Sequence, residues 1–133
     1  VLCPHLCLIK DGMPGYCGGR GNRNGALFAL TFGKISSCAF DPVEKKPLYH
    51  FYPGHKTCSV GTVGCNLRCR HCQNWQISCC DVEGVIDELQ DLSPLALVQM
   101  AIHNNCESLV WTYNEPSIWY EYIIWMFVVI GAT

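Results

Sequence analysis

The sequence is short of charged residues. Asp, Glu, Lys and Arg make up 15% of its 133 residues, whereas folded domains average about 25%. Lys and Arg are absent after Arg70. Residues 1–80 carry nine basic and three acidic side chains, whereas residues 81–133 carry eight acidic side chains and no Lys or Arg. A chain that is 50% hydrophobic with a net charge of −2 has too much apolar surface to stay disordered. Because the basic residues form no run, we expect no nucleic-acid partner.

Long apolar runs are also missing. The longest uncharged apolar stretch, residues 122–133, has 12 residues, and a membrane-spanning helix needs about 20. The first residues, Val-Leu-Cys-Pro-His, have neither the basic start nor the apolar segment of a signal peptide. We therefore expect no membrane partner and a cytoplasmic location, where cysteines stay reduced.

Cysteine, in contrast, is abundant. The chain has 11 cysteines, and only Cys106 lies beyond Cys80. Such a number indicates a disulfide framework, a metal or iron–sulfur protein, or a set of buried thiols. An odd number does not allow complete intramolecular pairing, so a metal-binding protein is the favoured class. Cys38, Cys58 and Cys106 have apolar neighbours and are expected to be buried thiols, whereas the pair Cys79-Cys80 matches no motif.

The first half of the chain predicts small β-structure. Asn24-Gly25 is typical of a hairpin turn, and residues 26–32 after it are rich in strand formers. Residues 41–54 contain three prolines and are expected to form an irregular connector.

The second half predicts one parallel βαβ unit. Strands are expected at residues 57–62 and 108–112, with a helix between them that starts at Ser93-Pro94 and runs to about Asn104. In parallel sheets, functional groups collect on the loops at the carboxyl ends of the strands. The most unusual motif of the chain follows the first of these strands.

That motif is a C-x3-C-x2-C triplet formed by Cys65, Cys69 and Cys72. Three thiolates on one short loop can converge on a soft metal centre. A structural zinc site needs four ligands, so three thiolates without a local fourth indicate an iron–sulfur cluster with one open iron. From the spacing alone, disulfide bonds or half of a zinc site remain open as alternatives.

Cys3, Cys7 and Cys17 form a second constellation, C-x3-C-x9-C. An accessory zinc site or a second cluster fits these residues, and so does a purely structural set of reduced thiols.

Several segments together resemble the radical S-adenosylmethionine (radical SAM) enzymes of the AmmeMemoRadiSam-system type, which are relatives of the pyruvate formate-lyase-activating enzymes. The segments are Cys3-Pro4-His5, Gly15-Tyr16-Cys17, EKKPLYHFYPG at 44–54, SVGTVGCN at 59–66, CQNW at 72–75 and WTYNEP at 111–116. The resemblance extends to about Tyr122. It implies an α/β fold with two parts: a small cysteine-containing β-rich region (residues 1–55) and the N-terminal part of a partial (β/α)6 TIM-like barrel (residues 56–133).

The resemblance also implies roles for individual residues. Cys65, Cys69 and Cys72 would hold three irons of a 4Fe–4S cluster, and the fourth iron would bind the amino and carboxylate groups of S-adenosylmethionine (SAM). His71 would lie near the adenine. Tyr113, Asn114 and Glu115 would receive the SAM amino group, since a carboxylate and an amide carbonyl accept from an ammonium. The alternative for Glu115 is an ordinary acidic residue at a helix start.

The chemistry implied is hydrogen abstraction. An electron donor such as flavodoxin or ferredoxin would reduce the cluster, and SAM would then yield a 5′-deoxyadenosyl radical that attacks an unknown substrate, either a protein or a small molecule. Activation of a glycyl-radical enzyme is one such reaction. Lys56, Arg68 and Arg70 would offset the negative charge of the cluster, or else form a solvated face.

Two other functions stay open: an iron–sulfur carrier or electron-transfer module, and a zinc-binding, cysteine-rich interaction domain. A full α/β barrel takes about 250 residues, so we expect these residues to be the front of a larger enzyme and not fully active alone. Residues 123–130 depart from the resembled family, in which an amphipathic helix with Lys or Arg is expected there. The alternatives are a strand or an aberrant sequence.

Overall fold

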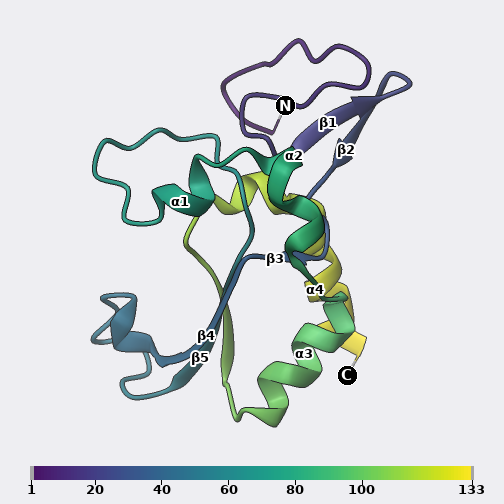
Figure 1. Cartoon of the computed structure of the whole chain (residues 1–133). Helices are drawn as coiled ribbons and strands as arrows, with labels where there is room; N and C mark the ends of the chain where they lie inside the picture. The colour runs from purple at the N-terminus through teal and green to yellow at the C-terminus, as the bar shows by residue number, and fades with distance from the viewer. Residues whose placement is uncertain (1, 133) are drawn as a thin grey trace.

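The computed structural model describes residues 2–132, which form a mixed α/β fold built on three small sheets (Figure 1). The central sheet has three strands, β4 (Ser37–Pro42), β5 (Lys56–Gly61) and β7 (Ser108–Trp111). The middle strand, β5, pairs with β4 antiparallel and with β7 parallel. Every residue of β5 after Lys56 is buried, as expected for a strand with neighbours on both sides.

The remaining strands lie in two antiparallel pairs. β1 (Arg20–Arg23) and β2 (Ala26–Ala29) form a hairpin, and β3 (Lys34–Ile35) pairs with β6 (Gln90–Asp91). The hairpin turn is the predicted one, because Asn24 and Gly25 both have positive φ, 54° and 80°. The second hairpin strand is shorter than predicted, since the chain turns after Ala29.

The helices are mostly short. Their bounds are α1 (Trp75–Ser78), α2 (Val82–Val85), α3 (Pro94–His103), α4 (Tyr120–Ala132) and the 3-10 helices η1 (Val43–Lys45), η2 (Ile86–Glu88) and η3 (Pro116–Trp119). The predicted start of α3 is confirmed, because Ala96 N donates to Ser93 Oγ at 3.2 Å. β5, α3 and β7 therefore form the predicted parallel βαβ unit.

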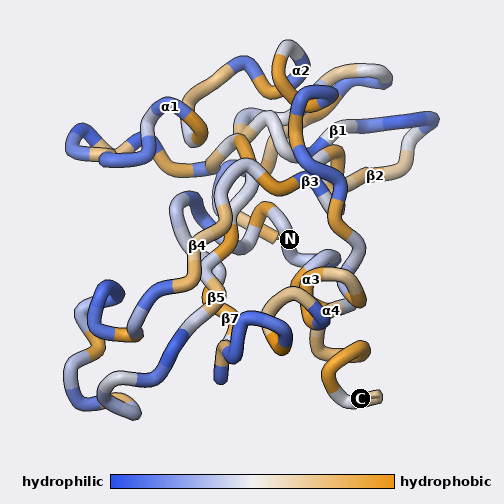
Figure 2. The backbone as a smooth tube through the Cα atoms, turned by 60° about the horizontal axis from the view of Figure 1, so that its bottom comes forward, coloured by the Kyte–Doolittle hydropathy of each residue, from blue (hydrophilic) through white to orange (hydrophobic). Residues whose placement is uncertain are grey.

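Residues 123–130 lie in the last helix, α4, so the strand that the sequence left open as one alternative is wrong. From Tyr122 onward the sequence of α4 is apolar on all sides, so neither helical nor strand periodicity is visible in it. α4 packs beside α3 on one side of the central sheet (Figure 1). Figure 2 shows the hydrophobic character of α4, and Trp125 and Phe127 remain exposed. In the described part of the chain, no helix has the length and apolar character needed to cross a membrane.

One hydrophobic core joins the sheet to α3, η3 and α4. Trp119 stacks on Tyr122 with ring centroids 4.4 Å apart, and both side chains are buried. The other buried members are Ile35, Cys58, Val60, Leu97, Val98, Ala101, Ile118 and Met126. Trp119 Nε1 also donates to Thr31 O at 2.7 Å, which ties the core to the N-terminal region.

The two parts expected from the sequence share this core. β4 belongs to residues 1–55 and completes the sheet of β5, and Ile35 packs in the same cluster as α3. A boundary at residue 55 stays a prediction, as does the partial barrel. The described residues supply one βαβ unit and no closed barrel.

Candidate functional site

The carboxyl ends of β5 and β7 face a common hollow of about 160 Å³, which we call the strand-end hollow. Because the two strands are parallel neighbours, the loops that follow them leave the sheet at the same edge. The lining residues are Cys65, Leu67, Cys69, Cys72, Ser78, Cys79, Tyr113, Asn114 and Glu115. The structure therefore brings together six of the seven predicted site residues. His71 is exposed and does not line the hollow, so its role toward an adenine stays a prediction.

The cysteine loop is closed at its base by α1. Gly64 N donates to Ile77 O at 2.8 Å, so the three cysteines lie on a loop whose two ends are hydrogen-bonded to each other. Gly64 has φ +80°, and a Cβ there would overlap the carbonyl oxygen of Cys17. Glycine is required at this position for both reasons.

The donor set of the strand-end hollow fits an iron–sulfur cluster. All eleven cysteines, which lie within residues 2–132, are free thiols, and Leu67 N donates to Cys65 Sγ at 3.4 Å. Near the loop, Thr62 Oγ1 and Asn66 Oδ1 are buried without a hydrogen-bond partner. Over the same residues, no three His, Cys, Asp or Glu side chains already stand as a group of metal ligands. A metal bound to this loop would therefore require the thiols to lie closer together than they do here, as in sites where metal binding is coupled to folding.

The segment after β7 forms the opposite wall. Asn114 links the two strand ends, since its Nδ2 donates to Gly64 O at 2.8 Å and its Oδ1 accepts from Thr62 N at 3.4 Å. Its amide thus holds the loops together in this structure. Tyr113 has φ 75°, a conformation that non-glycine residues rarely adopt and that concentrates at functional sites.

Two further properties define this wall. Burial, followed by the charge of Asp41, raises the pKa of Tyr113, so its phenol stays protonated at neutral pH. Glu115 Oε1 accepts from Ser117 N at 3.1 Å and caps η3. The helix-start role of Glu115 is therefore realised, and its carboxylate lines the hollow at the same time.

The N-terminal segment braces the cysteine loop from outside. His5 Nε2 lies 2.7 Å from Asn66 O, and the His5 ring stacks on Tyr16 with centroids 4.3 Å apart. The guanidinium of Arg68 lies 4.4 Å from the Tyr16 ring centroid and donates to Tyr16 O at 3.0 Å. Cys65 N also donates to Cys17 O at 3.1 Å. We call His5, Tyr16 and Arg68 the brace.

A second hollow of about 330 Å³, the N-terminal hollow, contains the other cysteine constellation. It is lined by Leu2, Cys3, Leu6, Cys7, Ile9, Gly15, Cys17, Arg20 and Leu27. Arg20 is 6% exposed, and its Nε has no hydrogen-bond partner. Its Nη1 and Nη2 donate to Glu121 at 2.8 and 2.5 Å. The three thiols predicted to act together thus share one hollow with a buried cation.

Other predicted residues lie elsewhere. Lys56 begins β5 at the end opposite the cysteine loop and donates to Asn104 O, so its predicted role beside the cluster is wrong. Cys58 is fully buried, and burial raises its pKa to about 12. Cys106 is partly buried, whereas Cys38 is exposed rather than buried.

The sequence profile of the Radical SAM superfamily matches residues 59–132, the part of the chain that contains both walls of the strand-end hollow. The chain belongs to the radical SAM superfamily. This family implies an enzyme, and its members normally bind a 4Fe–4S cluster and SAM.

A relative is known from Methanocaldococcus jannaschii, the uncharacterized protein MJ0808. It is 45% identical over 124 residues, which are 92% of this chain and 36% of that protein. This radical SAM chain therefore spans about a third of the length of that relative. No solved structure matches the chain.

The sequence interpretation missed two parts of the site. Cys79 lines the strand-end hollow, although it belongs to no motif, and its only sequence signal is its position seven residues after Cys72. The brace joins residues far apart in the chain, such as Tyr16 and Arg68, and no local pattern could have revealed it.

Proposed function

We propose that this chain is the cluster- and SAM-binding part of a radical SAM enzyme of the AmmeMemoRadiSam-system type. In this proposal Cys65, Cys69 and Cys72 hold three irons of a 4Fe–4S cluster at the strand-end hollow. When bound and reduced, the cluster supplies an electron to SAM and so provides a 5′-deoxyadenosyl radical for hydrogen abstraction. The observation that carries the proposal is that these three thiols and Tyr113-Asn114-Glu115 line one hollow, at the carboxyl ends of two parallel strands.

The residues of the chain have distinct tasks in this proposal. The thiolates bind iron, and the Leu67 N–H bonded to Cys65 Sγ lowers the electron density on that sulfur, which raises the cluster potential. Glu115 accepts a hydrogen bond from the amino group of SAM. Asn114 holds the two loops at a fixed separation through its bonds to Gly64 and Thr62.

The substrate class and the electron donor belong to the proposal as well. A flavodoxin or ferredoxin would deliver the electron in the cytoplasm, and the hydrogen donor is a protein or a small molecule. Because the cofactors carry the chemistry, the identity of that donor depends on residues that shape the substrate pocket. Glycyl-radical enzyme activation is one candidate reaction.

The test is anaerobic reconstitution with iron and sulfide, followed by reduction and addition of SAM. We expect about four irons and four sulfides per chain for the cluster at the strand-end hollow, a change in the electron paramagnetic resonance signal on SAM addition, and formation of 5′-deoxyadenosine. Zinc bound without sulfide would contradict the proposal.

A second candidate function is an iron–sulfur carrier or a zinc-binding module. Cys79 favours it, because four thiols line the strand-end hollow and a closed set of four thiolates suits both structural zinc and a non-catalytic cluster. An intact cluster whose signal does not respond to SAM would support the carrier.

We also propose a metal at the N-terminal hollow, held by Cys3, Cys7 and Cys17 as an accessory zinc or a second cluster. A centre with three thiolates is rich in negative charge, and the buried guanidinium of Arg20 suits such a neighbour. The test is metal analysis of a variant in which Cys65, Cys69 and Cys72 are all replaced by Ala. Metal that remains there and is lost on further replacement of Cys3, Cys7 and Cys17 would support this site, and a metal-free variant would overturn it.

A further inference from the structure

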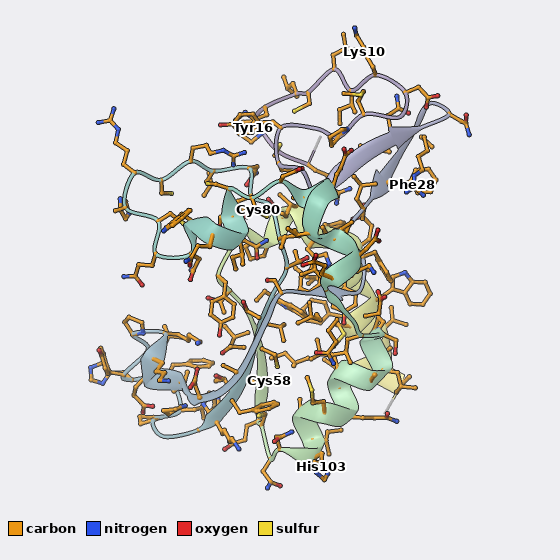
Figure 3. The ribbon with its side chains drawn as sticks, viewed as in Figure 1. Lys10, Tyr16, Phe28, Cys58, Cys80 and His103 are labelled. Carbon is orange, nitrogen blue, oxygen red and sulfur yellow. The ribbon has the colours of Figure 1, made fainter. Side chains whose placement is uncertain are left out.

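The adjacent cysteines Cys79 and Cys80 face different hollows. Cys79, at the C-terminal end of α1, lines the strand-end hollow with the three cysteines of the motif. Cys80 Sγ instead donates to Ile77 O at 3.3 Å, and Cys80 lines another hollow together with Cys17 and Arg68. Figure 3 labels Cys80 where the chain passes from α1 toward α2. Two thiols that are equivalent in the sequence therefore have different surroundings.

Three hydrogen bonds fix the position of Cys79. Its backbone N–H donates to Trp75 O at 2.9 Å, and Ile77 O accepts from Gly64 N at 2.8 Å. Ser78, between them, is 3% exposed and donates from Oγ to Tyr113 O at 3.4 Å. α1 is thus tied both to the start of the cysteine loop and to the opposite wall. These bonds hold the backbone of Cys79 at this edge of the hollow, whereas its side chain is exposed and is not held by them.

We infer that Cys79 is a fourth thiolate ligand, which binds the open iron when SAM is absent and is displaced when SAM binds. The inference rests on the proposed function, because it assumes a cluster on the other three cysteines. Four thiolates complete a 4Fe–4S cluster. Cys79 releases its proton to water when its sulfur binds iron. When SAM replaces it, the ammonium group of SAM gives up a proton so that its nitrogen can bind iron with a carboxylate oxygen, and Cys79 takes up a proton. No electron moves in this exchange.

This exchange lowers the apparent affinity for SAM. Only the fraction of molecules in which Cys79 has left the iron can bind SAM, so the apparent Kd rises by the inverse of that fraction. If Cys79 occupies the iron about nine-tenths of the time, its removal strengthens SAM binding about tenfold. The same thiolate protects the fourth iron from loss, because an iron with only exchangeable ligands is the first to leave.

The test compares Cys79→Ala with Cys80→Ala and the unsubstituted protein, all reconstituted anaerobically. SAM affinity is measured by equilibrium dialysis, and loss of one iron under ferricyanide is followed by electron paramagnetic resonance in the absence of SAM. We expect about tenfold tighter SAM binding and faster iron loss in Cys79→Ala, with Cys80→Ala matching the unsubstituted protein.

Equal SAM affinity and equal iron loss in all three proteins would overturn the role of Cys79 and leave the proposed function standing. Equal changes in Cys79→Ala and Cys80→Ala would also overturn it, since they would point to a general effect on α1. Failure of all three proteins to respond to SAM would overturn the proposed function and this inference together.

Discussion

The strand-end hollow and the N-terminal hollow both carry cysteines, yet their surroundings differ. The strand-end hollow lies at the carboxyl ends of parallel strands and has polar groups, Tyr113, Asn114 and Glu115, on its other wall. The N-terminal hollow is about twice as large, has apolar walls with Leu2, Leu6, Ile9 and Leu27, and contains the cation of Arg20. Both sets begin with the spacing C-x3-C, so that part of the pattern does not distinguish them. The groups opposite the thiols decide whether a bound metal can also receive a polar ligand such as SAM.

The two hollows are also mechanically connected. Cys17 lines the N-terminal hollow, and its carbonyl oxygen accepts from the backbone N–H of Cys65. The brace adds contacts between His5, Tyr16 and Arg68 on the same side. A change in the N-terminal segment therefore reaches the cysteine loop, whereas the chemistry expected at each hollow is separate.

The largest expected difference between the hollows is in cluster content. Replacing Cys65, Cys69 and Cys72 together by Ala leaves Cys79 as the one thiol that lines the strand-end hollow, so the SAM-responsive cluster should be lost. Replacing Cys3, Cys7 and Cys17 together should leave the SAM-responsive cluster in place. Anaerobic iron and sulfide analysis with electron paramagnetic resonance measures both, and Cys80→Ala is the control. A SAM-responsive signal that survives loss of Cys69 but not loss of Cys7 would reverse the assignment.

The junction between the hollows should be the most sensitive point for stability. In Gly64→Ala the new Cβ meets the Cys17 carbonyl at a residue with φ +80°, and we expect a loss of about 3–4 kcal/mol in the free energy of unfolding. Gly54→Ala is the matched control, because Gly54 has φ +82° and nothing within 4 Å of a Cβ. Its expected loss is about 1 kcal/mol. Urea unfolding measures both, and similar losses would show that the contact with Cys17 is unimportant.

Local patterns predict the parts of this fold whose cause is local. The Asn24-Gly25 turn, the Ser93 cap and the βαβ order each depend on a few adjacent residues. The strand-end hollow is predictable for a similar reason, because two loops after parallel strands must meet. The motif around Cys65 and the segment from Tyr113 each follow such a strand.

The parts of the fold and of the site that the sequence does not predict depend on contacts between distant residues. The sequence pattern does not predict where β4 ends, because Asp41 and Pro42 are poor strand formers. Only their pairing with β5 holds them extended. α4 is apolar from Tyr122 onward, so its periodicity does not distinguish helix from strand. Cys79 reaches the hollow because α1 folds back onto Gly64. None of these contacts has a signal in the adjacent sequence.

The ion pair beside the N-terminal hollow should depend on pH. The hydrogen bond from Arg20 lowers the pKa of Glu121 below its usual 4.5. A lowered pKa adds stability that is complete above about pH 4.5 and is lost as the pH falls through the folded-state value. Glu121→Gln should remove this pH dependence. It should also lower the free energy of unfolding at pH 7 by about 2 kcal/mol, because Arg20 stays buried without its partner. This loss is smaller than for a fully buried pair, since the Glu121 side chain is 42% exposed.

Asp91→Asn is the control for that pair, because Asp91 pairs with Lys34 at 2.9 Å but is 75% exposed. Its expected effect is below about 0.5 kcal/mol. Unfolding in urea between pH 3 and pH 7 measures both variants. If both variants lose the same free energy of unfolding at pH 7, the burial of Arg20 does not strengthen its ion pair with Glu121.

The smallest expected effect concerns the brace, and it tests whether the N-terminal segment serves the strand-end hollow. Tyr16→Ala removes the ring between His5 and Arg68, which should lower the free energy of unfolding by about 1 kcal/mol. Because the loop then opens more often, a chelator should remove iron a few times faster from the reconstituted protein. Tyr49→Ala, at an exposed position outside the brace, is the matched control. Iron loss at the same rate in both variants would mean that the cysteine loop holds its shape without the N-terminal segment, and the two hollows would then be independent in mechanics as well as in chemistry.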